Sequence, residues 1–114
     1  MATCVDLAGA AYPTNINGVA ITPLEGTSLV PAFSGGALAR DGAIYFEHEG
    51  NRAVRQGRWK LVAKGARGRW ELYDMDADRS ELNNLADRQP ERVRQLADQW
   101  EAWAARAKAK PWPW

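Results

Sequence analysis

The fold is decided by residues 43–75, AIYFEHEGNRAVRQGRWKLVAKGARGRWELYDM. Short runs rich in aromatic and β-branched residues alternate here with turn signals at Glu49-Gly50-Asn51, Gln56-Gly57 and Gly65–Gly68. The strands predicted from these runs are Ala43–Glu49, Arg52–Arg55, Trp59–Ala63 and Trp70–Met75. Because strands joined by such short turns pair with their sequence neighbours, the segment predicts an antiparallel meander.

The residues that follow predict a long helix. Pro90 suits the first helical position, and Glu91 suits the positive end of the helix dipole. Apolar residues recur at the spacing of one buried stripe, namely Val93, Leu96, Ala97, Trp100, Trp103, Ala104 and Ala107. Pro111 and Pro113 are expected to end this helix, and a shorter helical turn is predicted near Ser80–Leu85.

The first part of the chain has a different character, being rich in Gly, Pro, Thr and Ala. Met1–Ala10 predicts a short helix with Val5, Leu7 and Ala8 partly buried. From Asn15 to Gly36 neither a helical nor a strand period is visible, which predicts a long loop. A loop of this length within a compact domain indicates a missing packing partner.

The predicted fold class is therefore α+β. About four antiparallel strands pack against a long C-terminal amphipathic helix, after a loop-rich N-terminal segment. The predicted organisation is a loop-rich segment over residues 1–42, a sheet-plus-helix domain over 43–110, and a mobile tail over 111–114.

Composition narrows the class of protein. The net charge is +1 and the charges are interspersed, which argues against a nucleic-acid or membrane-surface partner. No run of about 18 apolar residues is present, and residues 1–12 lack a signal-peptide pattern, so a chain that starts here is expected in the cytoplasm. The single cysteine, Cys4, excludes an internal disulfide and is expected to be a small buried residue.

Several phrases resemble, in the right order, the C-terminal region of type I sulfatases, the arylsulfatase-like and formylglycine-dependent class. Residues 71–86, ELYDMDADRSELNNLA, resemble its "ELYDL … DP-x-E … NLA" signature, with Arg79 where the family has Pro. Residues 55–62, RQGRWKLV, resemble its "R-x-G-x-W/Y-K-L" strand. Asp6–Gly9 with Tyr12–Thr14 resembles the end of the catalytic domain. Residues 26–31, GTSLVP, resemble "D-G-x-S-L-x-P", with Glu25 for the Asp.

This resemblance implies a sulfuric ester hydrolase family, together with an incomplete catalytic apparatus. Family members convert the Cys or Ser of a C/S-x-P/A-x-R motif into formylglycine, beside a bound calcium or magnesium ion. Cys4 begins Cys-Val-Asp-Leu-Ala, which lacks both the Pro/Ala and the Arg. We therefore expect no catalytic residue, metal site or cofactor in this chain, with calcium and formylglycine confined to full-length members. The isolated chain is expected to be inactive, and full-length relatives are expected to include periplasmic or secreted proteins.

The resemblance also implies three substrate-pocket candidates, since the C-terminal subdomain of related sulfatases borders the cleft. They are His48, Asn51 and Arg52. Arg52 is able to meet a sulfate or carboxylate bidentately. The plainer alternatives are a strand-face histidine supported by its acidic neighbours, and a surface ion pair between Arg52 and Glu49.

The remaining distinctive residues favour structural roles. Trp59, Trp70, Trp100 and Trp103 have the spacing of core residues, which favours packing over a ligand-stacking platform. Trp112 and Trp114 are expected either to dock on a neighbour or to be mobile. The carboxylates of Asp74, Asp76 and Asp78, and the amide of Asn84, are expected to cap turns.

Two functions remain open from the sequence. The first is a non-catalytic region that completes the catalytic domain and substrate cleft of a sulfatase, with that domain as its partner. The alternative is a free-standing binding or assembly module derived from a sulfatase, which self-associates as a homodimer.

Overall fold

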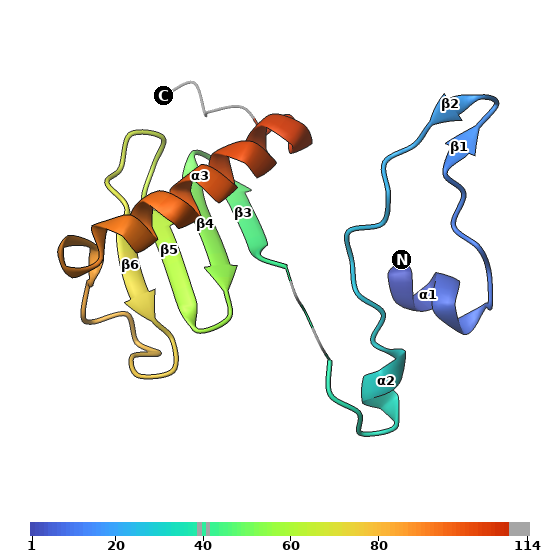
Figure 1. The fold of residues 1–114 in the computed structure, drawn as a ribbon, viewed down its shortest axis with the longest axis horizontal. Coiled ribbons are helices and arrows are strands. Elements are labelled where there is room, and N and C mark those ends of the chain that lie inside the picture. The colour runs from blue at the N-terminus through green and yellow to red at the C-terminus, as the bar shows by residue number, and fades with distance from the viewer. Residues whose placement is uncertain (39, 41, 110–114) are drawn as a thin grey trace. The chain divides into compact units, whose positions relative to one another are not determined.

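The computed structural model describes residues 1–38, 40 and 42–109. The chain divides into two compact units, Met1–Asp41 and Gly42–Trp114 (Figure 1). The predicted tail at 111–114, with the expected roles of Pro111, Pro113, Trp112 and Trp114, lies outside the described residues.

The second unit contains a four-stranded antiparallel sheet in which each strand pairs with its sequence neighbour (Figure 1). Its strands are β3 (Ile44–His48), β4 (Asn51–Gln56), β5 (Trp59–Ala63) and β6 (Glu71–Asp74). The predicted meander and the α+β fold class are confirmed.

Glycine-containing turns set the register of this sheet. Glu49 and Gly50 both have positive φ, 51° and 81°, which a two-residue type I′ turn requires. Gln56 pairs with Trp59, so the next turn consists of Gly57 and Arg58 instead of the predicted Gln56-Gly57. Gly57 takes the positive φ, 56°, and Gln56 remains in the strand.

Helix α3 (Pro90–Ala107) crosses one face of the sheet (Figure 1) and begins at the predicted proline. It ends at Lys108, which has the left-handed φ of 56°. The N–H of Lys108 then bonds to the carbonyl of Ala105, and the N–H of Ala109 to that of Ala104. This is a Schellman cap. Ala109 packs against the core in place of Ala107, which is exposed, contrary to the predicted stripe.

The core lies between α3 and the face of the sheet that α3 covers. Its buried members are Val54, Leu61 and Leu72 from the strands and Leu96, Trp100 and Ala104 from the helix. Trp59, Trp70 and Trp103 pack around them, so the predicted packing role of these tryptophans is confirmed. Trp70 meets Trp100 edge-on at 6.0 Å between ring centroids, and Tyr45 stacks on Trp103 at 5.2 Å.

The opposite face of the sheet, termed the helix-free face, carries alternate residues of the same strands. It includes Ile44, Phe46, His48, Asn51, Ala53 and Val62. Ile44 is 37% exposed and Phe46 is 53% exposed.

Between β6 and α3 the predicted helical turn near Ser80–Leu85 is wrong, because the helical turn is η1 (Ala86–Arg88). The Asp78 carboxylate accepts the N–H of Asn83, and Glu81 has a left-handed φ of 56°, so the chain cannot form a helix there. The Asn84 amide oxygen accepts the N–H of both Leu72 and Ala86. The capping role predicted for Asp78 and Asn84 is thus confirmed.

The first unit consists of α1 (Ala2–Leu7), a hairpin of β1 (Asn15–Ile16) and β2 (Val19–Ala20), and α2 (Val30–Phe33) (Figure 1). Asn17 and Gly18 form the hairpin turn with φ of 52° and 79°. The loop predicted from Asn15 to Gly36 is therefore interrupted by this hairpin and by α2, while the loop-rich character predicted for the N-terminal segment is confirmed. Two-residue strands are too short to show a period in the sequence, although the Asn-Gly dipeptide is a hairpin signal.

None of the described residues of the first unit is buried. Leu7 and Ala8 are exposed, contrary to the predicted partial burial, and so is Cys4. Two side-chain hydrogen bonds join distant parts of this unit. Ser28 Oγ donates to Asp6 Oδ2 and the N–H of Leu29 to Thr3 Oγ1, which tie α1 to the start of α2.

Among the described helices of the whole chain, none combines the length and apolar character needed to cross a bilayer.

Candidate functional site

The β3–β4 turn positions the three substrate-pocket candidates. His48 and Asn51 pair across the turn, where Asn51 Nδ2 donates to the carbonyl of His48 at 2.9 Å. Asn51 Oδ1 accepts the N–H of Gly65 at 3.0 Å, which links this turn to the turn that follows β5. Both side chains are exposed.

The structure does not bring all three candidates together. Successive strand residues point to opposite faces, so Arg52 lies on the helix-covered face while His48 and Asn51 lie on the helix-free face. The side chain of Arg52 is only 15% exposed. Its guanidinium carbon lies 4.5 Å from the ring centroid of Trp70 and 5.5 Å from that of Trp100.

The polar contacts of Arg52 reinforce this placement. Arg52 Nη2 donates to the carbonyl of Gly68 at 3.0 Å. Its acidic neighbour is Glu101 of α3, with Nη1 and Oε1 3.9 Å apart, instead of the predicted Glu49. Arg52 Nε is buried without a hydrogen-bond partner. These contacts of Arg52 connect the β3–β4 hairpin to α3 and to the loop after β5.

A pocket of about 210 Å³ lies beside Arg52, between the β3–β4 turn and α3. Its lining includes the buried Trp100 and Ala104 together with the carboxylates of Glu47 and Glu101. The sequence does not reveal this pocket, because Glu47 and Glu101 are 54 positions apart and meet only through the packing of α3 on the sheet.

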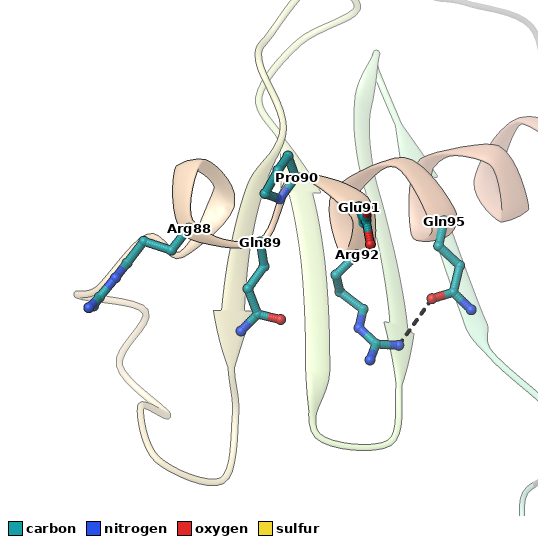
Figure 2. Close-up of a pocket in the computed structure, with 6 residues that line it drawn as sticks. All are labelled: Arg88, Gln89, Pro90, Glu91, Arg92 and Gln95. Carbon is teal, nitrogen blue, oxygen red and sulfur yellow. Dashed lines mark hydrogen bonds between the residues drawn. The ribbon is translucent and has the colours of Figure 1, made fainter.

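A larger hollow of about 470 Å³ lies at the start of α3 (Figure 2). It is lined by Arg88, Gln89, Pro90, Glu91, Arg92 and Gln95. Figure 2 shows Arg88 pointing away from the others, while Arg92 Nη1 donates to Gln95 Oε1 at 3.0 Å. None of the six residues is buried, so this is an open polar surface.

The segment that resembles the sulfatase signature makes structural contacts. Asp74 is 8% exposed and accepts hydrogen bonds from Arg58 through both carboxylate oxygens. The N–H of Asp76 also bonds to Asp74 Oδ1, which confirms the predicted capping role of Asp74. The hydrogen bonds from Arg58 and from backbone N–H groups hold the pKa of the Asp74 carboxyl below its usual value. On the same strand, the hydrogen bond from the Tyr73 O–H to Glu71, together with burial, raises the pKa of Tyr73 to about 12.

No group of three or more metal-ligating side chains occurs within residues 1–38, 40 and 42–109.

No protein-family model matches the chain. A curated sulfatase of Schizosaccharomyces pombe, itself uncharacterized, is 39% identical over 54 residues, which cover 45% of this chain and 10% of that protein. The chain is related to sulfatases. The resemblance seen in its motifs is confirmed to this extent, and the sulfatase-related chain spans about a tenth of the length of this curated relative.

Solved structures give the same partial match. Ps i-CgsB in complex with k-i-k-neocarrahexaose is 26% identical with a TM-score of 0.68, and the match covers 90% of this chain and 22% of that one. BT4656 in complex with its substrate D-glucosamine-2-N,6-O-disulfate is 25% identical with a TM-score of 0.63, covering 96% and 24%. A protein from a Bacteroides thetaiotaomicron locus for glycosaminoglycan metabolism shares the fold, with a TM-score of 0.69 at 21% identity. The sulfatase-related chain thus corresponds to less than a quarter of these structures.

Proposed function

We propose that this chain is a non-catalytic C-terminal region of an arylsulfatase-like sulfatase, which packs on the catalytic domain and completes its substrate cleft. The observation that carries the proposal is the unequal coverage of the two chains in each structural match. Between 90% and 96% of this chain matches only 22–24% of the solved structures. In this proposal, formylglycine and calcium belong to the catalytic domain.

The apolar surface of the first unit supports a packing role. Leu7, Val19 and Phe33 are 64%, 68% and 67% exposed, although the unit has no buried described residue. Exposed apolar surface of this kind marks sites of interaction. A catalytic domain lying against it supplies the burial that the unit lacks.

His48 and Asn51 are the residues that we assign to the wall of the substrate cleft. Both are exposed at the β3–β4 turn and free of the helix. Arg52 has the weaker claim, since its guanidinium is engaged by Gly68, Trp70 and Trp100.

Hydrolysis of a chromogenic aryl sulfate in the presence of calcium tests the non-catalytic assignment. The purified chain is expected to show no turnover, and neither is a Cys4→Ser variant, because the residues after Cys4 lack the Pro/Ala and Arg of the formylglycine motif. Turnover by the purified chain that disappears in Cys4→Ser would make Cys4 a nucleophile and overturn the proposal.

The second candidate function is a self-associating module derived from a sulfatase. The same exposed apolar residues favour it, together with Phe46 on the helix-free face. Sedimentation at high micromolar concentration separates the candidates. A concentration-dependent dimer that dissociates in a Phe46→Ser variant favours self-association, and a sharp monomer mass excludes it.

A further inference from the structure

The pocket between the β3–β4 turn and α3 has the size of a single side chain. Its volume of about 210 Å³ falls below the roughly 300 Å³ at which pockets for drug-sized ligands begin. A nucleotide exceeds this volume, whereas one extended side chain of a partner fits it.

The apolar part of the lining suits a hydrocarbon stem. Trp100 and Ala104 are 4% and 5% exposed, and Ala66, Ala105 and Ala109 add further methyl groups. Contact with these groups removes apolar surface of both partners from water.

The charges of the lining favour a cation. Glu47 and Glu101 contribute two carboxylates against the one guanidinium of Arg52. Glu47 is fixed at the turn, because its Oε1 accepts the N–H of Gly50 at 2.9 Å. The lining therefore carries a net charge of −1 at neutral pH.

An anionic occupant is disfavoured, because Arg52 is already engaged. Its Nη2 donates to Gly68, its Nη1 faces Glu101, and its Nε is closed off from solvent. A carboxylate or sulfate that entered the pocket would be repelled by two carboxylates, and the engaged N–H groups of Arg52 would offset little of that repulsion.

We propose that this pocket binds a lysine side chain of a partner polypeptide. The four-carbon stem lies against Trp100 and the alanine methyl groups, and the ammonium pairs with Glu101 and Glu47. A lysine combines a slender flexible stem with a compact charge, which fits this volume better than the planar fork of arginine. The inference does not depend on the sulfatase role, since it rests on the lining of one pocket.

A nuclear magnetic resonance titration of the ¹⁵N-labelled full chain with Nα-acetyl-lysine methylamide tests the inference. We expect saturable shifts of the Trp100 Nε1–H and Gly50 N–H signals. Nα-acetyl-norleucine methylamide has the same stem without the charge, and it is expected to bind about fivefold more weakly. The difference should shrink at high salt, because Glu101 is exposed.

Matched variants localise the effect. Glu101→Gln keeps the shape of a side chain that is 64% exposed, so the fold is retained, and it should weaken lysine-probe binding about threefold. Asp98→Asn removes a charge from an exposed position on the same helix and should leave the affinity unchanged. Equal affinity for the norleucine probe, an unchanged Glu101→Gln affinity, or the absence of saturable shifts would overturn the inference.

Discussion

At the scale of single residues, Arg52 shows how a side chain that suits anion binding can instead serve packing. Arg52 is a candidate for anion binding in the sequence, yet strand alternation turns it toward Trp70 and Trp100. Sequence reasoning predicted the neighbourhood of Arg52 but not its acidic partner. Glu49 is close along the chain, whereas Glu101 becomes a neighbour only when α3 packs on the sheet.

The ion pair of Arg58 and Asp74 predicts an acid-sensitive stability. Folding lowers the pKa of Asp74, so its contribution is present above the usual carboxyl pKa of about 4 and is lost as the pH falls through the lower folded pKa. In an Asp74→Asn variant, we expect a lower urea midpoint at pH 7 and a smaller loss of stability between pH 5 and pH 3. Urea unfolding at each pH measures both quantities.

The control for this experiment is Asp98→Asn, at an exposed position on α3. It should reproduce the pH dependence of the unaltered chain. If Asp74→Asn retained the full acid dependence as well, other carboxylates such as Asp78, whose pKa is also lowered by backbone N–H groups, would be responsible.

At the scale of elements, turn chemistry explains what the sequence could predict. The four strands and α3 were located because Gly-containing turns and Pro90 mark their ends. The hairpin of β1 and β2 and the position of η1 were missed. They depend on the positive φ of Asn17 and on single hydrogen bonds to Asp78 and Asn84, none of which leaves a periodic pattern in the sequence.

The packing of α3 on the sheet predicts the cost of a cavity. Leu96 is fully buried in the core, so Leu96→Ala should lower the free energy of unfolding by about 2–5 kcal/mol. The same substitution at Leu82, which is 81% exposed, should change it by less than about 0.5 kcal/mol. Urea unfolding followed by tryptophan fluorescence compares the two variants. Equal effects at both positions would show that α3 does not bury Leu96 in solution.

At the scale of the whole molecule, the two units differ in how much they bury. The second unit holds all of the buried residues described, and the first holds none. Composition pointed to this difference, since every tryptophan lies in the second half of the chain. The long stretch without a helical or strand period indicated a missing packing partner, but which residues that partner covers is set by long-range packing, which local sequence patterns do not encode.

Hydrogen exchange followed residue by residue measures this difference. Amides of residues 1–38 should exchange at least about 100-fold faster than those of β4 and β5, because opening the first unit exposes no core. Adding a sulfatase catalytic domain that binds the chain should slow exchange in residues 1–38. Uniform protection along the isolated chain would contradict the expectation that this unit needs a partner.

The order of the strands has a consequence for the speed of folding. Each strand of β3–β6 pairs with the next one along the chain, so forming the sheet closes only short loops and loses little chain entropy. The long closure comes with α3, when the Trp100 indole N–H reaches the carbonyl of Phe46, 54 positions away. The meander is therefore expected to form before the helix docks, and helix docking should set the folding time of the unit.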